Sequence, residues 1–304
     1  MVRVLVRRAI RLVVVAFGIS VIAFSLMHLT GDPASTILPE ATESERARLR
    51  EVMGYNDPLL VQFGRFIANA ARGDFGKSFQ HQAPALPLVL ERMPVTLTLT
   101  LLSLGLALVV AVPAGIYSAV RRNSLSDHVV TVTVFLGQSM PIFWVGIMLM
   151  LLFAVHFRLL PVSGWGNWRY AVLPAITLGI FQMPLLLRIV RSSMLDILGL
   201  EYVRTARAKG AREWAVICRH ALINAAIPLV TVAGLQFGIL LGGAVITESV
   251  FAIPGVGRLI VRAINNLDFP VVQAGVFLLA MIIVTVNFLV DILYTYLDPR
   301  VRML

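Results

Sequence analysis

Cysteine and charge are both scarce in this sequence of 304 residues. The single cysteine, Cys218, can form no disulfide within the chain, which excludes a disulfide-stapled secreted fold and a cysteine-ligated metal site. We interpret it as a small packing residue. Charged residues make up only 14% of the chain, whereas soluble domains contain about 25%. This shortage excludes an ordinary soluble globular protein.

Apolar residues are correspondingly abundant. They make up 58% of the chain, and the mean hydropathy is +0.86. Because a bilayer crossing takes about 20 apolar residues, the sequence predicts a single polytopic membrane domain over residues 1–304. The net charge of +10 does not indicate nucleic acid as a partner, since the arginines lie between apolar runs rather than on a soluble basic surface. Membrane topology explains the charge better.

Six uncharged stretches bounded by ionisable residues predict six transmembrane helices and an all-α fold, at residues 12–31, 93–120, 129–155, 170–187, 221–247 and 269–290. With the N-terminus inside, the inner segments hold 15 of the 26 basic residues but only 6 of the 16 acidic ones. The positive-inside rule therefore predicts that both termini are cytoplasmic. The first stretch has no small-residue cleavage site after it, so we expect a retained helix rather than a signal peptide.

The longest segment between predicted spans, residues 32–92, is expected outside the membrane with helices of its own. Thr42 and Glu45 fit a capping box, and Gly54 fits the end of that helix. Asp57 followed by Pro58 predicts the start of a second helix with one apolar face. We expect a small helical cap on the outer face; the alternative is a mere spacer.

The inner loop at residues 196–220 is basic and has apolar residues at near-helical spacing. Gly210 interrupts it, so the sequence predicts two short helices joined by a turn. One interpretation is a docking element for a cytoplasmic partner. The other is a basic amphipathic loop that lies on anionic lipid.

The apparent catalytic and metal-binding motifs each lack a required residue or the required spacing. Residues 73–78 (GDFGKS) imitate a phosphate-binding loop, but Ala71 stands where that loop needs glycine. Pro141 likewise replaces the second glycine of a nucleophile elbow around Ser139. Four of the five histidines, His28, His128, His156 and His220, lie near span ends, and no pair of them has metal-ligand spacing. We therefore expect no catalytic residue, no metal site and no ATP bound by this chain.

Uncharged polar residues are the main polar groups expected within the spans. Such groups either bond to neighbouring helices or face a water-filled pathway, and both alternatives stay open here. The candidates are Gln138, Ser139, Gln182 and Gln236. The carboxylates of Glu248 and Asp291 fall at span ends, which weakens an ion-coupled transporter.

Motifs along nearly the whole chain resemble permease subunits of bacterial ABC importers, most of all the dipeptide, oligopeptide and nickel group. The inner loop carries the strongest resemblance, at residues 201–210 (EYVRTARAKG) and 219–228 (RHALINAAIP). The signature glutamate of such importers is absent, because Arg204 begins the triplet that precedes Gly210. Further matches are residues 31–34 (GDPA), 72–78 (RGDFGKS), 141–144 (PIFW), 160–164 (LPVSG), 248–257 (ESVFAIPGVG) and 297–300 (LDPR).

The resemblance implies a fold and a function. The fold is that of a type I ABC importer permease, in the bacterial inner membrane. The chain forms half of the pathway for short peptides, beside a second permease subunit, two ATPase subunits that bind ATP and Mg, and an extracytoplasmic binding protein. Alternatives are the same machine for nickel chelates, glutathione or haem, and an ion-coupled secondary transporter. The inner loop becomes a coupling loop with candidate residues Arg204, Ala206, Arg207, Lys209, Gly210 and Trp214.

The loop after the fifth predicted span is a candidate extracytoplasmic gate. Pro254 and Gly255 predict a fixed turn, and Glu248 stands at the end of the span. The alternative is a capping turn with Glu248 merely solvated.

Overall fold

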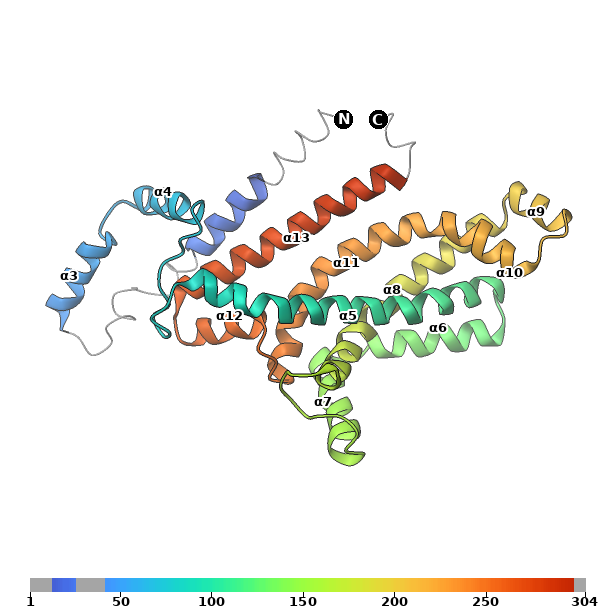
Figure 1. Cartoon of the computed structure of the whole chain (residues 1–304), viewed down its shortest axis with the longest axis horizontal. Coiled ribbons are helices and arrows are strands. Elements are labelled where there is room, and N and C mark those ends of the chain that lie inside the picture. The colour runs from blue at the N-terminus through green and yellow to red at the C-terminus, as the bar shows by residue number, and fades with distance from the viewer. Residues whose placement is uncertain (1–12, 26–41, 298–304) are drawn as a thin grey trace. The chain divides into compact units, whose positions relative to one another are not determined.

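A computed structural model describes residues 13–25 and 42–297 (Figure 1), and every secondary-structure element named in this part of the chain is a helix. The described residues divide into two compact units. Unit 1 comprises the described residues up to Val95 together with Pro254–Thr285, and unit 2 comprises Thr96–Ile253 together with the described residues from Val286 onward. The helices are Val13–Ser25, α3 (Glu43–Met53), α4 (Leu59–Ala70), α5 (Ala85–Val120), α6 (Leu125–Gln138), α7 (Ile142–Leu149), η1 (Met150–His156), α8 (Trp168–Leu198), α9 (Glu201–Ala208), α10 (Glu213–Ala215), η2 (Val216–Ala221), α11 (Leu222–Val250), α12 (Val256–Asn265) and α13 (Phe269–Leu297).

Four helical segments are long and apolar enough to cross a membrane: Ala85–Val120, Trp168–Leu198, Glu213–Val250 and Phe269–Val290. They contain the predicted second, fourth, fifth and sixth spans. A bent helix pair supplies a fifth candidate. Of the predicted first span, Val13–Ser25 forms an apolar helix, and the rest lies outside the described residues. The motif at residues 31–34, most of the tail motif and both termini also lie outside them, so the count of six spans stays a prediction.

The predicted third span is not one continuous helix. Its two halves, Leu125–Gln138 and Ile142–His156, meet at an angle of 100° (Figure 1). Pro141 lies at the break and explains it, because proline has no N–H to donate and disfavours helical backbone at the preceding residue, Met140. The second half is itself irregular, since α7 continues as a π-helix, η1.

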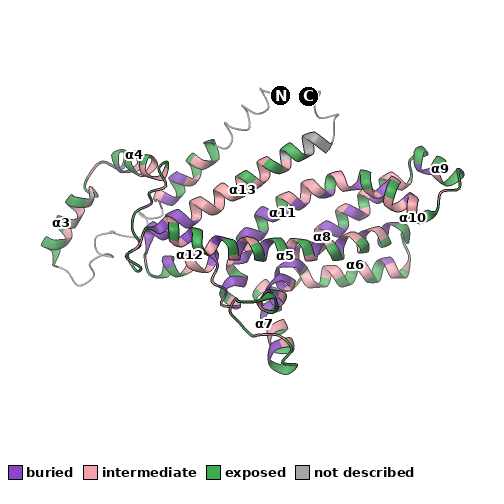
Figure 2. Ribbon diagram, viewed as in Figure 1, coloured by how far each residue is buried: buried purple, intermediate pink, exposed green. Residues whose placement is uncertain are grey.

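Unit 2 is built around α8. In the most apolar 18-residue stretch of α8, 61% is buried. The corresponding stretches of α5 and of the helical segment Glu213–Val250, which contains α11, are each 33% buried. Figure 2 shows the buried residues along α8. Small residues allow this close packing: a Cβ added to Gly115 of α5 would lie 2.8 Å from the Cβ of Val190 of α8. The shared apolar core is Ala107, Ala111, Ala119, Leu186, Leu187, Val190, Met194, Ala221, Ala225, Leu229 and Ala233.

Two of the predicted helix signals in the 32–92 segment are confirmed and one is wrong. The Glu45 carboxylate accepts a hydrogen bond from the Thr42 N–H at 2.8 Å, and Gly54 ends α3 with a φ of 68°. The hydrogen bonds that the Thr42 N–H and hydroxyl donate to this carboxylate lower the pKa of Glu45. The N-cap of α4 is Pro58 and not the predicted Asp57, whose carboxylate instead pairs with Arg65 at 2.6 Å.

The apolar face of α4 packs on protein. The ring of Phe63 lies 5.7 Å and 5.3 Å from the rings of Phe17 and Phe24 in the helix Val13–Ser25. Phe66 continues this stack between Phe24 and Phe75, at 6.0 Å and 6.3 Å. The amphipathic pattern that was assigned to a membrane surface therefore serves, at these two phenylalanines, to hold α4 on a neighbouring helix.

Candidate functional site

The segment predicted as the coupling loop, residues 196–220, contains regular helix at both of its ends. α8 runs to Leu198, and helix resumes at Glu213. α9 is an independent short helix, as predicted. The second predicted helix is not independent: α10 has three residues and continues through η2 into α11 as one helical segment, Glu213–Val250. Figure 1 shows α9 and α10 together at one end of α8 and α11.

Gly210 makes the turn between α9 and α10. Its φ of 78° lies in the left-handed region, which costs other residues about 1–2 kcal/mol. Its N–H donates to the Arg207 carbonyl at 2.9 Å, and the Ala211 N–H donates to the Ala206 carbonyl at 3.2 Å. A Cβ at Gly210 would meet nothing within 4 Å. The backbone conformation, rather than the available space within this chain, is therefore what requires glycine.

Two basic residues around the turn, Arg204 and Arg207, are paired with glutamates of the same segment. Arg207 reaches across Gly210 to Glu213, with Nη2–Oε1 at 2.7 Å and Nε–Oε2 at 3.2 Å. The hydrogen bonds from its guanidinium to Glu213 raise the pKa of Arg207. Arg204 pairs with Glu201 at 2.8 Å. Such exposed pairs contribute about 0–1 kcal/mol to stability, so their main effect is to fix the shape of the turn.

Trp214 projects from this turn, with 76% of its surface exposed. Lys209 is exposed as well and forms no ion pair within the described ranges. Val203 and Val216, by contrast, are completely buried. The turn is therefore packed on its inner side and presents an indole on its outer side. Large exposed aromatic groups of this kind are typical of protein interfaces.

A polar network that sequence reasoning missed attaches α9 to the start of α11. The hydroxyl of Tyr202 donates to the carbonyl of His220 at 3.2 Å. The amide of Asn224 donates to the same carbonyl at 2.9 Å and to the Tyr202 oxygen at 3.0 Å. His220 lies in the π-helix η2, whose widened hydrogen-bond ladder has no sequence signal. These hydrogen bonds hold α9 against the start of α11.

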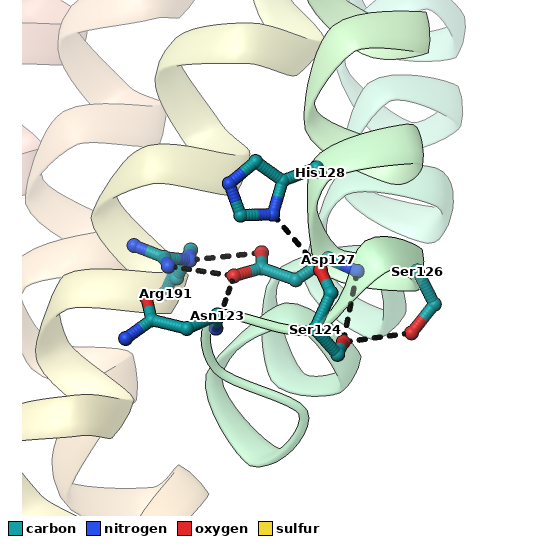
Figure 3. Close-up of polar contacts among 6 residues, drawn as sticks. All are labelled: Asn123, Ser124, Ser126, Asp127, His128 and Arg191. Atoms are coloured by element: carbon teal, nitrogen blue, oxygen red, sulfur yellow. Dashed lines mark hydrogen bonds and ion pairs between the residues drawn. The ribbon is translucent and has the colours of Figure 1, made fainter.

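A buried ion pair, also missed from the sequence, fixes the start of α6 against α8 (Figure 3). The Asp127 side chain is only 3% exposed and receives Arg191 Nη2 at 2.8 Å and Nε at 3.2 Å. The N–H of Asn123 donates to the same carboxylate at 3.0 Å. Ser124 caps α6 by accepting the Asp127 N–H at 3.2 Å. Arg191 lies seven residues before the end of α8, so this pair stabilises the part of α8 that leads into α9.

The predicted pathway residues separate into two groups. Gln182 of α8 and Gln236 of α11 are both buried, and the Gln236 amide donates directly to the Gln182 oxygen. This contact supports the packing alternative for these two residues in the conformation described. Gln138 and Ser139 are exposed at the end of α6, where the Ser139 hydroxyl donates to the Phe135 carbonyl at 3.2 Å. Among the described residues no hydrogen bond joins the two groups, and a pathway role for either stays a prediction.

The gate residues also separate. Glu248 is completely buried in α11 and accepts the Thr96 hydroxyl at 2.6 Å, so the alternative of a merely solvated carboxylate is wrong. Its position near a span end hid this burial. The turn that follows uses Ala252, with a φ of 52°, as its left-handed residue. Gly255 is instead the N-cap of α12 and, with Pro254, belongs to unit 1, whereas Glu248 belongs to unit 2.

Comparison with known proteins decides which kind of membrane protein this is. The profile of the binding-protein-dependent transport system inner membrane component matches residues 111–303. The profile of the N-terminal part of such membrane components matches residues 1–100. The chain belongs to this family. It is accordingly a multi-pass protein of the inner membrane, and the family assignment does not favour the ion-coupled secondary transporter.

Several relatives in this family match over nearly their full length. The dipeptide transport system permease protein DppB of Alkalihalophilus pseudofirmus is 38% identical, over 97% of this chain and 98% of its own. A probable peptide ABC transporter permease protein of Sinorhizobium fredii is 38% identical, over 98% of both chains. The glutathione transport system permease protein GsiC of Escherichia coli is 39% identical, over 99% of both chains.

A solved structure supports the fold. A chain from the inward-facing MetNI methionine ABC transporter superimposes with a TM-score of 0.58, over 69% of this chain and 96% of that chain. Its sequence is only 20% identical, so the likeness concerns the fold alone. The all-α polytopic fold predicted from the sequence is thereby confirmed.

Proposed function

We propose that this chain is one of two membrane subunits of an ATP-driven importer for short peptides. The observation that carries the proposal is the identity of about 38% with dipeptide and peptide permeases over nearly whole chains. The chain would form half of the translocation pathway beside a second permease subunit. An extracytoplasmic binding protein would deliver the peptide, and two partner subunits would bind and hydrolyse ATP with Mg. No catalytic residue or cofactor is assigned to this chain.

The turn from α9 to α10 is proposed as the coupling element. Its exposed Trp214 would bind a groove on an ATPase subunit, and α8 and α11 would carry the resulting motion into the membrane. The Tyr202–His220–Asn224 network and the Asp127–Arg191 pair support this role, because they tie the turn and its neighbouring helix ends together. In this proposal both termini and α9 would lie in the cytoplasm, and the 32–92 segment would lie outside.

Glutathione is a second candidate cargo. The relatives named as glutathione permeases are 39% identical, so identity alone does not separate them from the dipeptide permeases. Both cargoes are short peptides with free carboxylates, which fits one pathway chemistry.

The test is purification of the full chain in mild detergent, followed by reconstitution into proteoliposomes. We expect ATPase subunits to co-purify, and uptake of labelled alanyl-alanine to require ATP and the binding protein. Transport without ATP by the chain alone would contradict the proposal. Glutathione as a competitor then ranks the two cargoes.

Orientation has its own test. In a Cys218→Ala background, cysteines introduced at Gln80 and Arg122 should differ: a membrane-impermeant thiol reagent should label only position 80 in intact cells. Labelling at position 122 would reverse the proposed topology.

A further inference from the structure

Unit 1 contains a pocket of about 320 Å³ whose lining is rich in arginine. It lies between the segment before α5, the first turns of α5, the helix α12 and the turn from α12 to α13. The volume falls at the lower end of small-molecule sites, which occupy about 300–1,000 Å³. The polar residues that line it are Gln80, His81, Arg92, Arg258, Arg262, Asn266 and Asp268.

The local sequence explains why the arginines gather here. Arg258 and Arg262 stand four residues apart in α12, so they share one face of the helix, while Val256, Ile260 and Ala263 are buried. Arg92 approaches from α5. Neither Arg92 nor Arg262 has a hydrogen-bond or ion-pair partner for its side chain in the described part of the chain. The pocket thus holds guanidinium groups that this part of the protein does not neutralise.

The carboxylate that lines the pocket is already engaged with other groups. Asp268 is 1% exposed and accepts the Ser78 hydroxyl at 2.5 Å and the Phe79 N–H at 3.0 Å. Asn266 donates to the Gln80 side chain at 3.1 Å. These contacts hold the segment at residues 78–80 against the end of α12. Asp268 therefore shapes the wall of the pocket, and the pocket keeps an excess of positive charge.

We propose that this basic pocket binds the carboxylate of a short peptide during import. Guanidinium groups match carboxylates in charge and in planar, bidentate geometry. A concave site of this volume encloses the end of a small molecule better than it receives a broad protein surface, and on this ground we favour the peptide over an acidic side chain of the binding protein. The inference rests on the proposed function for the identity of the ligand.

The test uses the full chain in lipid nanodiscs, with its co-purifying subunits and without the binding protein. Equilibrium dialysis measures binding of labelled alanyl-alanine and of its C-terminal amide. We expect the amide to bind at least about tenfold more weakly, because a hydrogen bond between charged groups is lost. Arg92→Gln and Arg262→Gln should each weaken binding of the dipeptide by about tenfold, and Arg262→Lys should weaken it less. Arg72→Gln removes an exposed arginine outside the pocket and should change nothing.

Equal binding of the dipeptide and its amide would overturn the proposal, and so would unchanged binding by both glutamine variants. If these variants only raise the concentration of binding protein needed to stimulate ATP hydrolysis, the pocket receives that protein and not the peptide. Failure of the proposed function appears separately, as absence of ATPase subunits in the purified sample. Equilibrium dialysis of the dipeptide and its amide tests the carboxylate site whether or not ATPase subunits are present.

Discussion

Two arginine-rich regions of the molecule use their charge in opposite ways. In the segment from α9 to α10, Arg204 and Arg207 are each paired with a glutamate of the same segment. In the pocket of unit 1, Arg92 and Arg262 have no such partner in the described part of the chain. Arginines paired within their own segment give that segment a shape, whereas unpaired arginines in a hollow are available to a ligand. Basic composition alone does not distinguish these roles.

The comparison changes what is expected of the coupling turn. Because Arg204 and Arg207 are occupied by Glu201 and Glu213, binding to an ATPase subunit should depend more on Trp214 than on either of these two arginines. The exposed ion pairs shape this segment but add little to the free energy of unfolding. The buried pair between Asp127 and Arg191 should contribute more to it.

The largest effect is expected where a buried pair is broken. Asp127→Ala leaves Arg191 without its partner and should lower the free energy of unfolding by about 3 kcal/mol. This is the lower end of the range for breaking a buried ion pair, because 31% of the Arg191 side-chain surface is exposed. Unfolding of the purified chain in mixed micelles measures the loss. Glu201→Ala, which breaks an exposed pair, is the matched control and should cost less than about 1 kcal/mol. Equal losses for the two variants would remove the distinction between buried and exposed pairs.

The next effect concerns partner binding. Trp214→Ala should weaken association with the ATPase subunits by about 2 kcal/mol, or roughly thirtyfold, without loss of the chain from the membrane. Arg204→Ala should change association by less than about 1 kcal/mol. Titration of purified ATPase subunit onto nanodisc-embedded chain gives both values. A larger effect for Arg204 than for Trp214 would show that the arginines, not the indole, contact the partner.

Gly210→Val tests the shape of the turn. A β-branched residue at a φ of 78° should cost about 1–2 kcal/mol and misplace Trp214 and Arg207, although a Cβ itself has space. We expect normal membrane abundance with lost uptake and weaker ATPase association. Arg122→Ala controls for a general loss of positive charge. Full uptake by Gly210→Val at normal abundance would return the turn to the alternative of a basic helix on lipid.

Signals that are local in the sequence predicted local structure well. The apolar runs located four of the long helices, and Thr42, Glu45, Gly54 and Gly210 marked a helix start, a helix end and a turn. Each of these depends on a few neighbouring residues, so a linear pattern is sufficient to find it.

Contacts between distant residues could not be found in this way. Asp127 and Arg191 are 64 residues apart, and Thr96 and Glu248 are 152 apart. Each residue taken alone reads as an ordinary polar group near a span end, and only the packing of the helices shows which partner it has. The bend of 100° between α6 and α7 lies at Pro141, and the helices that α7 contacts there, α8 and α11, come later in the sequence.

Substitution of the buried Glu248 is the change with the smallest expected effect on stability. Glu248→Gln keeps the shape of the side chain and an oxygen that can accept the Thr96 hydroxyl, but it exchanges an acceptor that can carry a full negative charge for a neutral one. The difference between the two kinds of hydrogen bond is about 1 kcal/mol, so abundance and unfolding should change little. Thr96→Val removes the donor and should have a stability cost of similar size.

Uptake then decides what the buried carboxylate does. If Glu248 serves only packing, Glu248→Gln and Thr96→Val should reduce uptake in proportion to their small effects on stability. If its charge is needed at a gate, Glu248→Gln should reduce uptake and binding-protein-stimulated ATP hydrolysis at least tenfold at unchanged abundance, and Glu248→Asp should restore part of both. Unchanged uptake in Glu248→Gln would leave the carboxylate with a structural role, like that of Asp268 in the wall of the basic pocket.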